Sequence, residues 1–496
     1  MDADRRRALS LWDVGLVLAV VVLAALFVPE SDDCYFVYWQ YDSWTDFLLT
    51  RPVTDEARIV SVPHNGRYLG NLLGVLLAKS WGTPWAVFRV AYFAGGLLLL
   101  AWAGAAWLCS RRRREGTFLL LALLVLSFRG LWQEVYSWGA AYVNYLTPMA
   151  LALLLPLLLR GDGRWRPGGR RALLALVSCA ACLFLETVTI FLVLCAMAVL
   201  GTALAARRGR GEALALFLGT ALGAAVMFSA PGYGAVNSDG LRELGLSLLG
   251  ESLAQTLAGT VARPALTALF LTALLLWLLR RRGERRWLPW ALVALPLHLL
   301  CLAAWVRDLA DPGETVELPP ADPVLVGAGG ALAALWVVLL LLWRGRDWQR
   351  TAALAAALCL LSAPLLVIGV KGNRFFFPGY VALALIALSL WETARREGLS
   401  PSPGAGVRAL ALLAACALVF VYCSNRQVYC RRMEDALAQA AGGAEQVTLP
   451  LVPFPGYARN EQIWKGDVSY QIYRETPWDV AFTFVPYDQW AGPDGT

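Results

Sequence analysis

The sequence predicts an all-α protein that crosses a membrane many times, in about thirteen transmembrane helices. Of its 496 residues, 58% are hydrophobic and 16% are charged, whereas soluble domains usually contain about 45–50% apolar and about 25% charged residues. Apolar runs of roughly 20 residues, long enough to span a bilayer, recur along the chain. Because so little polar sequence cannot cover a soluble fold, we exclude a soluble enzyme, a nucleic-acid-binding protein and a disordered scaffold.

Positive charge indicates the side of the membrane on which each loop lies. Almost all of it is arginine, in clusters between the apolar runs at residues 5–7, 111–114, 164–171, 207–210, 280–286, 344–350 and 395–396. Cytoplasmic loops carry most of the Lys and Arg of a membrane protein. We therefore expect these clusters and the N-terminus on the cytoplasmic side of the plasma or inner membrane, and we expect no nucleic-acid partner.

The first apolar run, residues 11–29, follows the cluster at 5–7. It is long and lacks an A-x-A-like cleavage site, so we expect a retained anchor rather than a cleaved signal peptide. This places residues 30–84 outside, as the first outer loop. Apolar residues within 66–80 follow the i, i+3, i+4 spacing of a helix lying on the outer membrane surface. If that helix crossed the bilayer, the arginines at 111–114 would lie on the wrong side.

The remaining apolar runs predict twelve more crossings. They are 85–108, two within 114–160, two within 171–207, 212–229, 263–279, 288–305, 323–343, 351–370, 378–394 and 408–423. With this count every arginine cluster is cytoplasmic and the C-terminus is extracytoplasmic. Residues 1–424 form the transmembrane domain. Residues 425–496, rich in proline and in aromatics among polar residues, predict a small extracytoplasmic domain with short strands.

Candidate catalytic carboxylates lie on the outer side. Asp32 and Asp33 follow the first crossing directly, and an aromatic run from Tyr35 to Phe47 comes next. A carboxylate shielded at the mouth of a bundle can act as a general base, and an aromatic helix beside it would lie in the interface. The alternative is two solvated acids beside an aromatic belt. Glu186 falls at the tip of a tight hairpin, where it needs a partner unless the turn is solvated.

Other polar residues gather on the same predicted face. The basic loop with Lys371 and Arg374 suits a phosphate, although both side chains could instead extend to lipid headgroups. Further candidates for binding a substrate are His64, Asn65, Arg67, Glu134, Asn144 and Tyr145. Asp32, Asp33 and Glu186 could together hold Mg²⁺ or Mn²⁺ through oxygen atoms, but no other feature supports a metal, and we expect no cofactor.

From Asp32-Asp33 onward, the chain resembles the membrane glycosyltransferases of the GT-C type, which include protein mannosyltransferases and the aminoarabinose transferases of lipid A. The shared pattern is a first span, acidic residues opening a long outer loop, a surface helix, and a G-x-x-x-x-x-R-x step into the second span, here between Asn65 and Arg89. It covers the first ~110 residues, and the rest is similar in topology only. The Asn65-Gly66-Arg67 and Asn144-Tyr145 segments are also similar to those of a set of uncharacterised bacterial proteins.

The resemblance implies transfer of a sugar from a polyprenyl-phosphate donor, presented by the membrane lipid, to a cell-envelope acceptor that is a glycan, a lipid or a protein. Asp32 or Asp33 would deprotonate or orient the acceptor hydroxyl. Lys371 and Arg374, with Arg67, would stabilise the leaving phosphate, and one displacement would invert the anomeric centre. The alternatives are a transporter or flippase, or a polymerase or ligase, of lipid-linked saccharide. Broken helices at matching positions, typical of many transporters, are not evident in the sequence.

Overall fold

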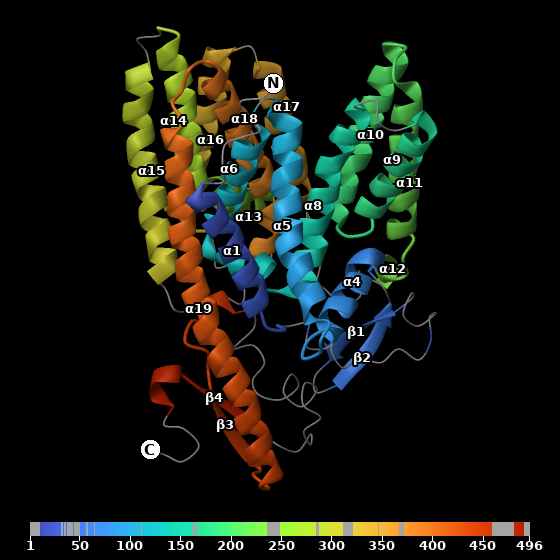
Figure 1. Ribbon diagram of the computed structural model, residues 1–496, viewed down its shortest axis with the longest axis vertical. Coiled ribbons are helices and arrows are strands. Elements are labelled where there is room, and N and C mark those ends of the chain that lie inside the picture. Colours follow the sequence, from blue (N-terminus) through green and yellow to red (C-terminus); the bar gives the residue numbers. More distant parts are fainter. Residues whose placement is uncertain are drawn as a thin grey trace.

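The computed structural model is a bundle of long helices, with two small pairs of strands at one end (Figure 1). It describes residues 10–30, 33, 36, 43, 50–55, 58–63, 65–110, 112–161, 166–235, 249–283, 287–310, 321–345, 347–366, 372–458 and 481–490.

Nine helices of the described chain are long and apolar enough to cross a membrane. They are α5 (Ala86–Leu108), α8 (Gly139–Arg160), α10 (Glu186–Ala205), α11 (Arg210–Phe228), α15 (Trp287–Ala310), α16 (Pro323–Trp343), α17 (Trp348–Ser362) with the 3-10 turn η4 (Ala363–Leu366), α18 (Phe377–Arg396) with the preceding 3-10 turn η5 (Asn373–Phe376), and α19 (Ser402–Ala441). The prediction of a multi-pass, mainly helical membrane protein is therefore confirmed.

Two sharply bent helix pairs, each either a broken span or a re-entrant segment, were not expected from the sequence. Helix α6 (Arg113–Val125) meets α7 (Arg129–Leu131) and the π-helix η1 (Trp132–Tyr136) at 95°. Helix α13 (Leu249–Leu257) with the π-helix η3 (Ala258–Ala262) meets α14 (Ala265–Arg281) at 69°. Counting each bent pair once gives up to eleven spans among the described residues.

We expected about thirteen transmembrane helices, and the described residues contain nine to eleven helices that are long and apolar enough to span. The two remaining predicted spans do form helices, α1 (Leu11–Leu26) and α9 (Pro167–Ala181), but these have 16 and 15 residues. Both are shorter than the roughly 20 residues that cross a bilayer without help from flanking segments. Thirteen crossings therefore remain a prediction, which requires α1 and α9 to span.

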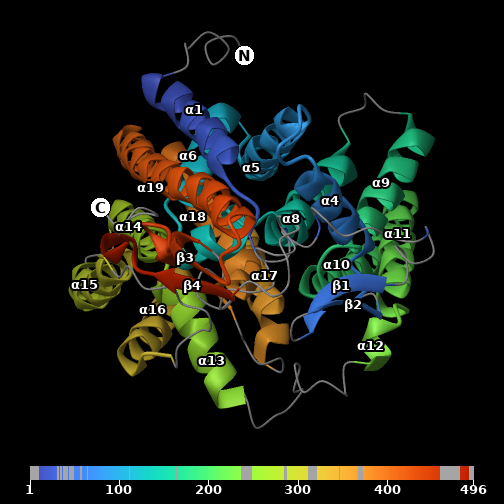
Figure 2. The ribbon, with the colours of Figure 1, turned by 90° about the horizontal axis from the view of Figure 1, so that it is seen from below.

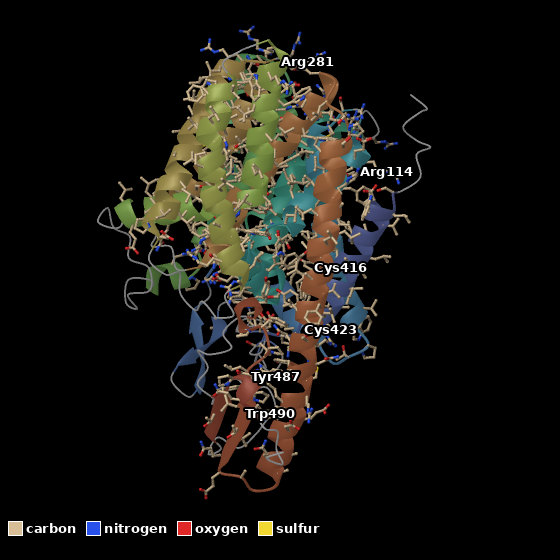
Figure 3. All side chains as sticks on the ribbon, turned by 90° about the vertical axis from the view of Figure 1, so that its left-hand side faces the viewer. Arg114, Arg281, Cys416, Cys423, Tyr487 and Trp490 are labelled. Atoms are coloured by element: carbon tan, nitrogen blue, oxygen red, sulfur yellow. The ribbon has the colours of Figure 1, made fainter. Side chains whose placement is uncertain are left out.

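Arginines and C-terminal strands lie at opposite ends of the bundle. Figure 3 shows Arg114 and Arg281 at one end, and Tyr487 and Trp490 at the other. We call the end with the strands the strand end. Helix α18 crosses the centre of the bundle, and 94% of the residues in an 18-residue window of η5 and α18 are buried. Because η5 directly precedes α18, it lies at the strand end, close to the site residues described below.

The C-terminal region is built on α19, which continues for 40 residues without a break. The domain boundary expected after residue 424 therefore falls inside a helix. Beyond α19, β3 (Gln446–Pro450) pairs in parallel with β4 (Ala481–Val485). The sequence had predicted short strands in this region. Tyr429, Val447, Leu449, Val452 and Ala458 form the small core of this region, and Val28 and Trp81 from the N-terminal part pack against it.

The first outer loop contains one helix that we expected and one hairpin that we did not. Helix α4 (Tyr68–Lys79) matches the predicted helix at 66–80 and lies beside α8 at the strand end (Figures 1 and 2). Before it, β1 (Thr50–Asp55) and β2 (Arg58–Pro63) pair antiparallel, with Asp55 opposite Arg58. The β-branched residues of this stretch were the available signal for strands.

A reporter fused after Thr496 tests the topology. With thirteen crossings and a cytoplasmic N-terminus, we expect an alkaline phosphatase fusion at this position to be active and a green fluorescent protein fusion to be dark. The same reporters placed after Arg208, in the turn between α10 and α11, should give the opposite result. A cytoplasmic signal after Thr496 would contradict the count and would mean that α1 or α9 does not cross.

Candidate functional site

Asp33 is buried and binds the first turn of α8. Its side chain is 5% exposed. Its Oδ2 accepts the backbone N–H of Gly139 at 2.8 Å, and its Oδ1 accepts that of Ala140 at 2.7 Å. Both N–H groups belong to the helix start, where no intrahelical acceptor exists and the helix dipole favours a negative charge. The carboxylate predicted as a catalytic base is therefore also the cap of α8.

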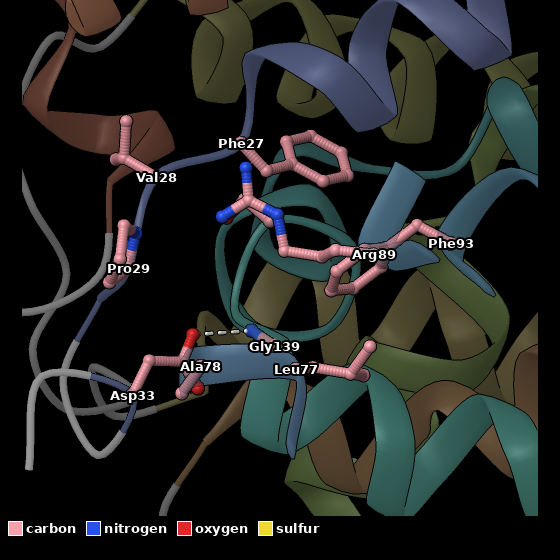
Figure 4. Close-up of a pocket in the computed structure, with 10 residues that line it drawn as sticks. Phe27, Val28, Pro29, Asp33, Leu77, Ala78, Arg89, Phe93 and Gly139 are labelled. Atoms are coloured by element: carbon pink, nitrogen blue, oxygen red, sulfur yellow. Dashed lines mark hydrogen bonds between the residues drawn. The ribbon is translucent and has the colours of Figure 1, made fainter. Parts of the chain in front are cut away.

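Asp33 lines a pocket at the strand end. A small, partly open pocket lies between the end of α1, helix α4 and the starts of α5 and α8. Phe27, Leu77 and Phe93 supply apolar walls, and Ser137 and Arg89 supply polar groups. Figure 4 shows the Asp33 carboxylate at one side, joined to Gly139, and the Arg89 guanidinium extending into the pocket from α5. We call this space the Asp33 pocket.

Arg67 and Glu186 form the first of two ion pairs near this pocket. The guanidinium holds the carboxylate with both Nε and Nη2, and the Nη2–Oε2 distance is 2.7 Å. Tyr233, in the short helix α12 (Gly232–Ala235), donates its hydroxyl to Glu186 Oε1 at 2.8 Å. Burial opposes the charge of Arg67, but the Glu186 carboxylate holds the pKa of Arg67 above its ordinary value. The expectation that Glu186 needs a partner agrees with this contact.

The Asn65-Gly66-Arg67 segment shapes the entrance to α4. Asn65 Oδ1 accepts the backbone N–H of Arg67 at 3.2 Å and the Asn71 side-chain amide at 3.3 Å. Gly66 has a φ of +80°, and a Cβ there would lie 2.3 Å from the carbonyl oxygen of Met227. Only glycine fits this left-handed, closely packed position. Asn65 thus fixes the turn that aims Arg67 at Glu186.

Arg374 and Glu134 form the second ion pair. Arg374 Nη1 lies 3.1 Å from Glu134 Oε2, and the backbone N–H of Arg374 donates to the same oxygen at 3.3 Å. The Glu134 side chain is only 1% exposed. The Arg374 guanidinium also stacks on Trp138, the residue that precedes Gly139, at 5.4 Å from the ring centre. Neighbouring residues at the start of α8 thus contact this ion pair and Asp33.

Asn373 joins the two bent helix pairs. Its Nδ2 donates to Glu134 Oε1 on η1 at 3.3 Å, and its Oδ1 accepts a hydrogen bond from Arg263 at the bend before α14. A Cβ on Gly130 would collide with the Asn373 amide, and a Cβ on Gly259 would collide with the Phe376 ring. Both bends therefore pack against η5, and the small residues permit the approach. π-Helical segments often mark functional positions.

Tyr145 lies between the two ion pairs. It is 2% exposed, its hydroxyl lies within electrostatic range of Arg374, Arg67, Glu186 and Glu134, and its ring contacts Phe375. One helix position earlier, Asn144 donates to the carbonyl of Ala140 at 2.8 Å. The buried Oδ1 of Asn144 has no hydrogen-bond partner in the described structure. The Asn144-Tyr145 pair thus brings an unsatisfied acceptor and a phenol to one place.

The structure brings together most, not all, of the predicted residues that it describes. Arg67, Glu186, Glu134, Arg374 and Tyr145 form one electrostatic cluster. Asp33 lines a pocket that Arg374 and Glu186 do not line. Asp32, His64 and Lys371 fall outside the described residues. Within the described chain, no three His, Cys, Asp or Glu side chains are arranged to hold a metal ion.

Arg89 and Asn373 are site residues that sequence reasoning did not identify as such. Arg89 had an available signal, because an arginine inside an apolar span is costly and needs a reason. Asn373 had none, because its role depends on segments that lie far away in the sequence. Comparison of the chain with protein-family models, curated proteins and solved structures gave no match.

Gly139→Ala tests whether Asp33 holds α8. A Cβ at this position would lie 2.8 Å from Asp33 Oδ2, so we expect the variant to lose the cap and about 1–2 kcal/mol of stability. Unfolding in detergent, followed by circular dichroism, measures the loss. Gly168→Ala is the matched control in the first turn of α9, where a Cβ meets nothing within 4 Å. Equal stability of the two variants would show that the Asp33 contact contributes little.

Proposed function

We propose that this chain is a membrane glycosyltransferase, which moves a sugar from a polyprenyl-phosphate donor to an acceptor hydroxyl at the outer membrane face. One observation carries the proposal. A buried carboxylate, Asp33, lines a pocket at the end of the bundle opposite Arg114 and Arg281, and the Arg374 guanidinium stacks on Trp138, the residue before the Gly139 that Asp33 binds. A reaction at this end would be open both to lipid and to the cell envelope.

Asp33 would act as the base. A carboxylate has about four lone-pair directions, and the N–H groups of Gly139 and Ala140 occupy two of them. An acceptor hydroxyl in the Asp33 pocket would donate its hydrogen bond to the same carboxylate. The acceptor oxygen then bonds to the anomeric carbon, and its proton goes to the carboxylate. The bond from that carbon to the phosphate oxygen breaks, its electron pair leaves with the lipid phosphate, and the configuration inverts. Asp32 remains the alternative base.

The charge of the leaving phosphate needs a cation. Arg374 and Arg67 are our candidates, together with Lys371, and both arginines hold carboxylates of their own. Before the donor arrives, each glutamate keeps its arginine desolvated and correctly placed. A phosphate that binds either arginine would then take the place of the glutamate. Such prearranged charge is the main source of stabilisation for a developing anion. Tyr145 and Asn144, between the pairs, would contact the sugar.

A transporter or flippase of lipid-linked saccharide is the second candidate, and the two bent helix pairs favour it. A transported substrate, however, needs polar side chains along a path through the bilayer. The ion pairs described above lie at the strand end, because their residues belong to η1, η5 and the starts of α4 and α10. Transfer at the outer face fits this distribution better.

Asp33→Asn tests the base. Asparagine keeps an oxygen that can accept from the start of α8, but it cannot take a proton, so we expect the transfer rate to fall about 100-fold or more. Transfer from a polyprenyl-phosphate sugar is measured with purified chain in proteoliposomes. Asp488→Asn, an exposed position beyond β4, should retain full activity. Full activity in a variant with both Asp32→Asn and Asp33→Asn would eliminate the proposed base.

The double variant Lys371→Ala with Arg374→Ala tests the phosphate site. We expect the KM for the donor to rise about tenfold through loss of charge-assisted hydrogen bonds. Glu134→Gln releases Arg374 from its carboxylate and should not weaken donor binding. Without Arg374, the buried Glu134 carboxylate of the double variant has lost this cation. A triple variant that also carries Glu134→Gln removes that buried charge and therefore controls for misfolding. An unchanged donor KM would place the phosphate elsewhere.

A further inference from the structure

Three arginines from separate parts of the chain meet at the end of the bundle opposite the strand end. Arg160 is the last residue of α8, Arg113 is the first residue of α6, and Arg350 lies in the first turn of α17. Figure 3 shows Arg114, the neighbour of Arg113, at this end. Arg160 lies within electrostatic range of both Arg350 and Arg113. We call these three residues the Arg160 cluster.

The last turn of α5 holds two of these arginines in place. Arg160 Nη1 donates to the carbonyl oxygen of Trp107 at 2.7 Å, and Arg350 Nη1 donates to that of the next residue, Leu108, at 3.0 Å. The last carbonyl groups of a helix have no partner within the helix and carry partial negative charge. These carbonyl groups fix the two guanidinium groups side by side without neutralising them, so the Arg160 cluster remains positive.

The carboxylate closest to the Arg160 cluster is shared with another arginine. Asp347 Oδ2 lies 3.6 Å from Arg350 Nη2 and 3.3 Å from Arg396 Nη1. Arg160 and Arg113 form no ion pair within the part of the chain that the structure describes, and both side chains are exposed. Arg160 uses one of its five N–H donors on α5. The other donors can therefore reach an anion that approaches from outside the bundle.

The depth of the Arg160 cluster matches that of lipid headgroups. Arg160 ends a helix of 22 residues, and Trp107 lies in the last turn of a helix of 23 residues. Both helices are long and apolar enough to cross the membrane, so their ends lie near the border of the hydrocarbon layer. Leu99 and Trp102 of α5 are exposed apolar side chains, as expected for a helix surface that faces lipid. The phosphate groups of the membrane lipids lie at the same border.

We propose that the Arg160 cluster binds the phosphate group of an anionic phospholipid in the leaflet at this end of the bundle. Arg160 and Arg113 contact the phosphate oxygens, because the planar guanidinium group can donate two parallel hydrogen bonds to phosphate. Arg350 adds its charge from its position on α5. The sequence predicts that this end is cytoplasmic, and basic pockets between helices on that side bind anionic headgroups. The inference does not depend on the proposed function, whose site lies at the strand end.

Calorimetric titration of the purified full chain in detergent tests the lipid site. The probes are dihexanoyl phosphatidylglycerol, which has a net negative charge, dihexanoyl phosphatidylcholine, which has none, and inorganic phosphate, which has no acyl chains. We expect phosphatidylglycerol to bind at least about tenfold more tightly than either other probe, and added salt to reduce its preference over phosphatidylcholine. No preference over phosphatidylcholine overturns the proposal. Equally tight binding of inorganic phosphate overturns the assignment to a lipid.

Variants assign the binding to the Arg160 cluster. Arg160→Gln and Arg113→Gln should each weaken phosphatidylglycerol binding about tenfold. Glutamine can still donate to the carbonyl oxygen of Trp107, so an Arg160 that only caps α5 would leave the affinity unchanged. Arg281→Gln is the matched control, because Arg281 is an exposed last residue of a helix, α14, at the same end (Figure 3).

The control variant should bind phosphatidylglycerol as the wild type does, and an equal loss in Arg281→Gln would overturn the assignment to the Arg160 cluster. If Arg160→Gln does not fold, Arg113→Gln decides, because Arg113 is exposed and its side chain forms no ion pair in the described chain. Wild-type affinity in Arg113→Gln then overturns the proposal. Because no sugar donor is present in these titrations, their result is independent of the transfer reaction.

Discussion

A charge buried at the end of an apolar bundle must be neutralised inside the protein, and this constraint arranges the strand end. Arg67 meets Glu186, and Arg374 meets Glu134, in pairs that draw segments far apart in sequence into contact. Removing one partner of such a pair typically costs about 3–5 kcal/mol, because the other charge stays buried. Asp33 binds the start of α8 through the backbone N–H groups of Gly139 and Ala140. The polar groups of the proposed site therefore also hold the helices together.

Asn373 shows how this arrangement is made specific. Its amide faces a carboxylate, Glu134, on one side and a guanidinium, Arg263, on the other. An amide can donate to one and accept from the other, so a single neutral residue joins two bent helix pairs through side chains of opposite charge. It is 3% exposed and lies directly before Arg374 on the buried η5–α18 segment. The orientation of Arg374 toward Glu134 therefore depends on the most deeply buried helix of the bundle.

The sequence predicted the helices well because hydrophobic length is a local property. An apolar run of about 20 residues is most stable in a bilayer as a transmembrane helix. The arginine clusters beside it predict which end is cytoplasmic. The β1–β2 hairpin and the two bends escaped prediction because pairing and packing between segments create them. For the site, the residue types at the outer face could be predicted, and so could the need of Glu186 for a partner. The sequence could not show that Arg67 is this partner or that Glu134 holds Arg374. These contacts depend on tertiary packing between residues that are 119 and 240 positions apart in the sequence.

Helix α19 has a mechanical consequence. A continuous helix of 40 residues is about 60 Å long, roughly twice the thickness of the hydrocarbon layer. Because it continues without a break from the bundle almost to β3, it fixes the distance between β3 and the bundle. A force applied to β3 would therefore be transmitted along α19 to Trp81 and to the end of α1, which both contact this region.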